Sequence, residues 1–133
     1  MDYYPPLLSG KTYHIFSRAV GNEKLFRNDD NYLFFLKKLD NYISPLANIF
    51  AYNLLPNHFH LLAEIKPEEE ILSKYLAVKK RNTLPETWQP DFITQQFSNF
   101  LNSYAKAFNK VNIRKGSLFM NSIRRLPMEK DAQ

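Results

Sequence analysis

Two histidines one residue apart, His58 and His60, are the residues of this sequence best suited to chemistry. They lie in the largely apolar stretch LLPNHFHLLAE, residues 54–64. If this stretch is a strand, both imidazoles lie on one face, about 6.6 Å apart along it, because side chains alternate between the faces. Two neutral imidazoles at that spacing can chelate one divalent ion and leave other positions to water, substrate or a third side chain. The pair also fits a purely polar role on an exposed face.

The elements that must position this pair follow from hydrophobic patterning and from turn residues. Strands are expected at 11–20, 48–55 and 58–66 and in the later part of 117–128, and the main helices over 29–43 and 94–111. A further helix is expected over 67–82, ended by a break at 84–90. The order strand, helix, strand, strand, helix, strand predicts an α+β, ferredoxin-like split βαβ fold, a four-stranded antiparallel sheet with its helices on one face. Both histidines then lie on the open face, because the alternate residues are apolar and must face the helices: Phe59, Leu61, Ala63 and Ile65.

Composition limits the class of protein. A chain of 133 residues with 44% hydrophobic content is expected to form one domain, residues 1–133. The absence of cysteine excludes disulfides, thiolate metal sites and a cysteine nucleophile. No membrane-spanning apolar run and no signal peptide is visible, so we expect a cytoplasmic protein with no membrane partner.

Positive charge is concentrated in the last third of the chain. The net charge is +5, and residues 92–128 contain no Asp or Glu. A solvated basic surface would explain this, but a phosphate-contacting face would explain it equally well. Aromatic residues make up 15% of the sequence and would suit stacking of unpaired bases. The candidate DNA-binding residues are Arg18, Lys106, Lys110, Arg114, Lys115, Arg124 and Arg125.

Several stretches of the sequence resemble those of a known family. YHIFSRAVGNEKLF, a helix, and then NIFAYNLLPNHFHLLAEI resemble the amino-terminal half of the single-tyrosine HUH transposases, in particular the REP-associated tyrosine transposases. The HUH motif is His, a bulky apolar residue, His, here His58-Phe59-His60. The later stretch SYAKAFNKVNIRKGSLFM resembles the family's helix and the basic glycine turn after it, so the likeness covers roughly residues 11 to 126.

The resemblance implies metal-dependent nicking and strand transfer of single-stranded DNA at hairpin-bearing repeats, which is DNA transposition. It implies that His58 and His60 hold Mg²⁺ or Mn²⁺ at the scissile phosphate. A tyrosine hydroxyl then attacks phosphorus and leaves a 5′-phosphotyrosine link and a free 3′-OH. The implied partner is single-stranded or hairpin DNA, and a homodimer is left open.

The sequence departs from the family at the nucleophile. The family carries it on a later helix, in a Tyr-Ile-x-x-Asn-Pro motif whose Asn is the third metal ligand. No residue here matches that motif, and the last tyrosine is Tyr104. We therefore expect a truncated chain, with the nucleophile beyond Gln133 and no activity of its own. Tyr104 is the alternative nucleophile, but it falls on an apolar helical stripe and is expected in the core.

Supporting roles and other classes stay open at this point. Glu64 is expected on the same strand face as His58 and His60, so it is a candidate partner for an imidazole. Tyr13, Tyr52 and His14 are assigned no chemical role. One alternative is a non-catalytic single-stranded nucleic-acid-binding module on a ferredoxin-like sheet. The other is a phosphoesterase that uses paired histidines as acid and base without metal, although such enzymes usually place them on separate strands.

Overall fold

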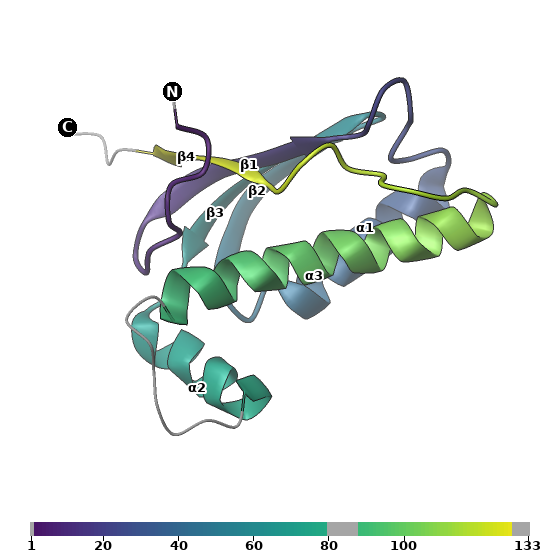
Figure 1. The fold of residues 1–133 in the computed structure, drawn as a ribbon. Coiled ribbons are helices and arrows are strands. Elements are labelled where there is room, and N and C mark those ends of the chain that lie inside the picture. The colour runs from purple at the N-terminus through teal and green to yellow at the C-terminus, as the bar shows by residue number, and fades with distance from the viewer. Residues whose placement is uncertain (1, 80–87, 129–133) are drawn as a thin grey trace.

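The computed structural model describes residues 2–79 and 88–128 of the chain. Its centre is a four-stranded antiparallel sheet in the order β2-β3-β1-β4 (Figure 1). Because β3 lies between β2 and β1, the sheet has split βαβ topology. The predicted α+β fold is thus confirmed. The strands are β1 Thr12–Arg18, β2 Ala47–Leu55, β3 His58–Ile65 and β4 Arg124–Met128.

Two long helices cover one face of the sheet and leave the other open (Figure 1). α1 spans Asp29–Tyr42, and its cap is Asn28, whose side chain accepts a hydrogen bond from the Asn31 N–H. α3 spans Trp88–Val111 and buries a long aromatic stripe against the sheet. The shorter α2, Glu68–Lys79, lies beside the start of α3.

The predicted start of α3 is wrong. The stretch Trp88-Gln89-Pro90 looks like a helix breaker in the sequence, yet it forms the first turn of α3. Proline is tolerated there because a first-turn N–H has no partner within the helix. Trp88 is buried against Tyr75 of α2, with ring centroids 5.1 Å apart, and this packing favours the earlier start. The rest of the predicted break, 84–87, and the predicted helix end, 80–82, lie outside the described residues.

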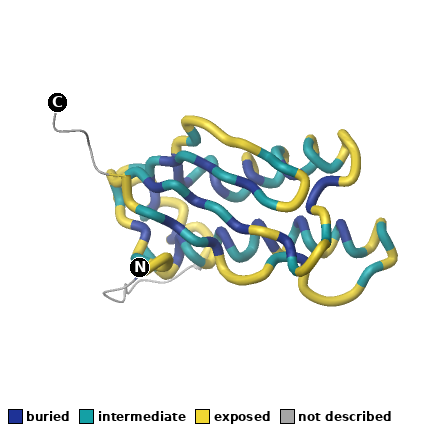
Figure 2. The backbone as a smooth tube through the Cα atoms, turned by 90° about the horizontal axis from the view of Figure 1, so that it is seen from above, coloured by how far each residue is buried: buried dark blue, intermediate teal, exposed yellow. Residues whose placement is uncertain are grey.

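The central strands β1 and β3 alternate in burial, as the sequence pattern predicts (Figure 2). Phe59, Leu61, Ala63 and Ile65 of β3 are buried under the helices. His58 and His60 are partly exposed on the opposite face. The predicted face of the two histidines is therefore confirmed.

Strand register fixes which side chains meet on the open face. Phe16 of the central strand β1 lies opposite His60 on one side and Arg124 on the other. Arg18 lies opposite His58. Residues from early, middle and late parts of the sequence therefore share one surface. No helix in the described ranges is long and apolar enough to cross a membrane.

Candidate functional site

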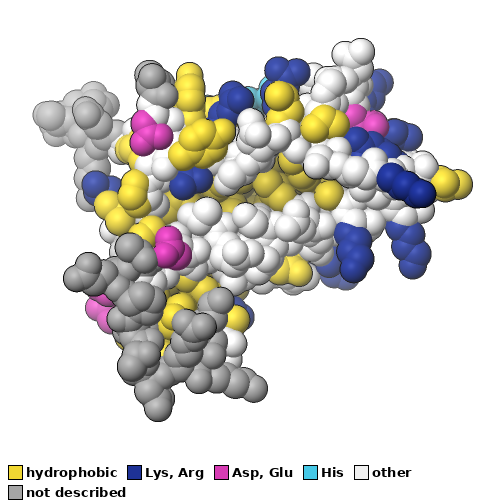
Figure 3. All heavy atoms as spheres, in the orientation of Figure 1, with side chains coloured by type: hydrophobic (Ala, Val, Ile, Leu, Met, Phe, Trp, Pro, Cys, Tyr) yellow, Lys and Arg dark blue, Asp and Glu magenta, His cyan; other side chains and the backbone are white. Residues whose placement is uncertain are grey.

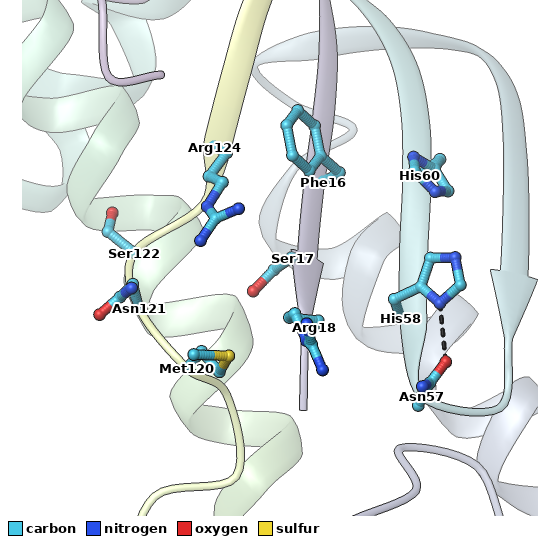
Figure 4. Close-up of a pocket in the computed structure, with 10 residues that line it drawn as sticks. All are labelled: Phe16, Ser17, Arg18, Asn57, His58, His60, Met120, Asn121, Ser122 and Arg124. Carbon is cyan, nitrogen blue, oxygen red and sulfur yellow. Dashed lines mark hydrogen bonds between the residues drawn. The ribbon is translucent and has the colours of Figure 1, made fainter. Parts of the chain in front are cut away.

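His58 stands at the start of β3 and is oriented by the residue before it. Its Nδ1 lies 2.7 Å from Oδ1 of Asn57 in the turn between β2 and β3 (Figure 4). Since an amide oxygen only accepts, His58 donates its Nδ1 proton to Asn57. In the neutral form of the ring, the lone pair of Nε2 is then free to bind a metal. A neutral imidazole held through its other nitrogen is the usual arrangement of a metal-binding histidine.

His60 is held by a third histidine from the neighbouring strand. Its Nδ1 lies 2.7 Å from Nε2 of His14, and the two rings stack with centroids 4.9 Å apart. Burial, together with the nearby His14 and His58 rings, lowers the pKa of His60 below its ordinary value. His60 is therefore neutral at neutral pH and able to act as a ligand.

A pocket of about 330 Å³ opens beside these rings (Figure 4). It lies between β1, β3 and the segment that leads into β4. Two guanidinium groups line it, those of Arg18 and Arg124, and none of its lining residues is acidic. The pocket therefore suits an anionic group. Its lining residues are Phe16, Ser17, Arg18, Asn57, His58, His60, Met120, Asn121, Ser122 and Arg124.

The donor set fits part of a divalent-metal site. The rings of His58 and His60 have centroids 5.0 Å apart on the same face. In each ring Nδ1 contacts a neighbouring side chain, so Nε2 is the nitrogen that can bind a metal in the appropriate tautomer. Among residues 2–79 and 88–128, however, no group of three or more His, Cys, Asp or Glu has an arrangement that could hold a metal. Two imidazoles alone leave most positions of an Mg²⁺ or Mn²⁺ ion to oxygen donors such as water or phosphate.

Glu64, the candidate imidazole partner, is engaged elsewhere. Its carboxylate accepts a long hydrogen bond, 3.5 Å, from the Asn48 side chain of β2. The group that does contact an imidazole is His14, to which the sequence assigned no role. The alternation of β1 places His14 on the open face with Arg18. In the register of β1 against β3, His14 lies opposite Leu62 and reaches His60 diagonally.

The seven candidate DNA-binding cations fall into different environments. Arg18 is exposed and Arg124 is half-buried, and both line the pocket. A second group lies at the end of α3 and in the turn after it, where Figure 3 shows Lys and Arg side chains gathered. Its exposed members are Lys106, Lys110 and Lys115. These five are placed where a phosphate can reach them.

Arg125 does not share the surface of Arg124. It faces the helix side of the sheet, is only 6% exposed, and burial lowers its pKa. Its guanidinium donates hydrogen bonds to the carbonyls of Pro5 (2.7 Å), Ile123 (3.0 Å) and Tyr4 (3.4 Å). The expectation that Arg125 contacts DNA must be corrected, because this buried group instead fixes the amino-terminal segment.

Arg114 is also occupied within the protein. Its Nε lies 2.8 Å from the Glu23 carboxylate, and its other nitrogens donate to Asn109 and to the carbonyls of Gly116 and Ser117. Glu23 forms a second ion pair with Arg27. Hydrogen bonds, first from Arg27, then from the Lys24 backbone and Arg114, lower the pKa of Glu23 to about 2. Arg114 thus holds the turn after α3.

Tyr104 lies in the core, as its helical spacing predicts. Its side chain is 1% exposed, and its hydroxyl donates to the backbone carbonyl of Leu25. Burial raises the pKa of the Tyr104 phenol above its ordinary value. A buried, protonated phenol on the helix side of the sheet does not reach the pocket on the open side.

Comparison with known proteins adds one finding. No protein-family model matches the sequence, and no curated protein matches it significantly. Among solved structures, the fold is similar to that of a REP-associated tyrosine transposase bound to a REP hairpin, with a TM-score of 0.56 and 12% sequence identity. The match covers 98% of this chain and 63% of that one, so this chain spans less than two thirds of the transposase. At this identity the likeness establishes a transposase-like fold.

Proposed function

We propose that this chain is the metal- and DNA-binding part of a single-tyrosine HUH endonuclease that nicks and transfers single strands of hairpin-bearing DNA. The observation that carries the proposal is the pocket on the open face, where two oriented histidines lie beside two arginines and no acidic residue. The similar fold of a transposase bound to a REP hairpin supports it.

Each pocket residue has a chemical role in this proposal. Asn57 keeps the proton of His58 on Nδ1, and His14 holds the ring of His60, so both rings are oriented before DNA arrives. Arg18 and Arg124 offset the charge of the phosphodiester. A divalent ion, Mg²⁺ or Mn²⁺, would bind at His58 and His60 and stabilise the negative charge that gathers on the phosphate.

The nucleophile of the proposed reaction is a tyrosine outside the pocket residues. Attack by its hydroxyl on phosphorus forms a 5′-phosphotyrosine bond, breaks the bond to the 3′ oxygen, and releases a 3′-OH. Tyr104 does not serve, because its hydroxyl is buried and bonded to Leu25. We therefore expect no covalent protein–DNA adduct from this chain alone.

The test uses the full chain and a labelled hairpin oligonucleotide with a single-stranded flank. Fluorescence anisotropy with and without Mn²⁺ should show tighter binding with the metal and weaker binding as salt rises. His58→Ala and His60→Ala should each abolish the effect of Mn²⁺, while Glu64→Gln, on the same face but bonded to Asn48, should retain it. Calorimetric titration that shows undiminished Mn²⁺ binding in His58→Ala would refute the two-histidine site.

A denaturing gel of the same mixtures tests the nucleophile. We expect no adduct with Mn²⁺ present. An adduct that carries a 5′-phosphate and disappears in Tyr104→Phe would show that the assignment of Tyr104 to the core is functionally incomplete.

A second candidate function is supported by a specific observation. Non-catalytic single-strand binders of this fold use aromatic rings on the central strands. Phe16 lies on the open face of the central strand β1 and lines the pocket. If binding of the oligonucleotide is unchanged by EDTA and by His58→Ala, this second function replaces the first.

The metal-free phosphoesterase is less well supported. His14 and His60 do stand on separate strands, as is usual in such enzymes. Their rings bond directly to each other at 2.7 Å, however, and so do not lie on two sides of a phosphate. Activity that persists in EDTA and is lost in His14→Ala would favour this third mechanism.

A further inference from the structure

The amino-terminal segment, residues 2–8, crosses the β4 edge of the sheet. Figure 1 shows it starting on the open side beside β4 and passing toward the helix side. The carbonyl of Tyr3 accepts a hydrogen bond from the backbone N–H of Arg125, 2.8 Å, and Leu7 is fully buried in the core. Tyr3 is thereby fixed at the rim of the open face.

The Tyr3 ring meets the side chains of that face. It lies edge-on to Phe16, with centroids 6.1 Å apart and planes at 90°. The guanidinium carbon of Arg124 lies over it, 5.6 Å from its centroid. Tyr3 nevertheless keeps 37% of its surface exposed. It is an aromatic ring held in place with part of its surface free.

The aromatic row continues to the histidines. Phe16 lies 5.9 Å from His60, with the two planes inclined by 29°, and 5.0 Å from His14. Figure 4 shows Phe16 on β1 between Arg124 on β4 and His60 on β3. Tyr3, Phe16 and His60 therefore form a continuous path from the β4 edge to the pocket.

We infer that Tyr3, Phe16 and Arg124 form a base-stacking subsite that takes one unpaired base of a single DNA strand while a neighbouring phosphate occupies the pocket. This inference rests on the proposed function and adds to it the place where the strand enters. Aromatic rings stack any base because every base has a π-face, and guanidinium groups do the same while also meeting phosphate.

Charge and rigidity favour a nucleic-acid strand over another occupant. The pocket offers Arg18 and Arg124 and no lining acid, which suits a chain of phosphates. Arg125 holds the carbonyls of Tyr4 and Pro5 from beneath, so the Tyr3 backbone is ordered before binding. A preformed ring loses less conformational freedom when a base stacks on it.

The test measures stacking directly and without metal. The intact chain, in EDTA, is titrated with a single-stranded oligonucleotide that carries 2-aminopurine at one position, and with a counterpart that is abasic there. Tyr3→Ala should weaken binding of the intact strand by roughly 5- to 150-fold, the range measured for loss of one stacked base. Tyr3→Phe, which keeps the ring, should bind as the native chain does. The quenching of 2-aminopurine should fall in Tyr3→Ala and should be retained in Tyr3→Phe.

Two controls keep the result specific. Tyr52→Ala removes a more exposed tyrosine, 56%, from β2. Tyr52 pairs with Leu61, so it lies on the helix side. This variant should bind normally. Phe16→Leu keeps an apolar side chain without an aromatic ring, and it should reproduce the loss seen in Tyr3→Ala if the fold, checked by thermal melting, is intact.

The outcomes separate this inference from the proposed function. If Tyr3→Ala binds as tightly as the native chain, or loses as much affinity for the abasic strand, the stacking subsite is refuted. The metal-dependent binding that needs His58 would survive that result. If the native chain binds no single strand under any condition, both the subsite and the proposed function are refuted.

Discussion

Replacing Arg125 by methionine should destabilise the protein without removing a phosphate contact. Methionine fills similar apolar volume but removes the guanidinium and its bonds to Pro5 and Ile123, at 2.7 and 3.0 Å. Each hydrogen bond from a charged donor contributes about 1.5–3 kcal/mol. The loss is offset because the variant no longer buries a charge. We expect a net loss of about 2–4 kcal/mol, or roughly 10 °C in Tm for a chain of this size.

Arg124→Met is the matched control, because the neighbouring residue points to the opposite face. Urea denaturation should show Arg124→Met within about 0.5 kcal/mol of the native chain, as is usual for surface changes. DNA titrations at several salt concentrations should instead show an effect of Arg124→Met and none of Arg125→Met. Arg124→Met should lower the salt dependence by about one phosphate contact, whereas Arg125→Met, measured below its Tm, should leave the slope unchanged.

The reasoning would be refuted if Arg125→Met lost a phosphate contact and no stability. If Arg125→Met is as stable as the native chain and loses one unit of salt dependence, its guanidinium contacts phosphate. The burial described here would then not represent the DNA-bound protein.

Three further predictions concern other buried or paired groups. Tyr104→Phe leaves a backbone carbonyl without its partner and should cost about 1–2 kcal/mol in urea denaturation; a loss of DNA binding at unchanged stability would contradict its core role. Because hydrogen bonds, first from Arg27, lower the pKa of Glu23 from 4.5 to about 2, the stability they contribute is complete above pH 4.5 and is lost as the pH falls toward 2. Glu23→Gln should flatten that part of the stability curve, by no more than about 1 kcal/mol since the pair is partly exposed. In metal-free buffer the His60 ring should titrate by NMR below the ordinary pH of a histidine, and His14→Ala should raise its pKa; an unchanged titration would show that the two rings are not in contact.

Much of the architecture could be predicted from local pattern. The alternation along residues 58–65 determined the buried face of β3 and, with it, the open face of His58 and His60. The apolar spacing over residues 29–43 located α1. Such features depend only on neighbours in sequence, which is why they can be read from it.

The remaining features depend on contacts between distant residues. His14 meets His60 diagonally across β1 and β3, and this contact depends on a strand register that no local pattern encodes. Charge alone suggested that both Arg124 and Arg125 contact DNA, yet consecutive strand residues point to opposite faces. Arg114 pairs with Glu23, a residue far earlier in the chain, so its structural role was not visible from the basic composition of its segment.

The pairing of β4 with the central strand β1 has a consequence for synthesis of the protein. Thr12 lies opposite Met128, so β1 completes its ladder on this side only when a strand made much later has left the ribosome. Until then one edge of β1 has unpaired backbone groups, and such edges recruit other extended chains. Contacts of such high sequence separation also form slowly. The nascent chain therefore exposes an unpaired edge of the central strand β1 until β4 has been made, and we expect chaperones that shield unpaired edges to raise its soluble yield.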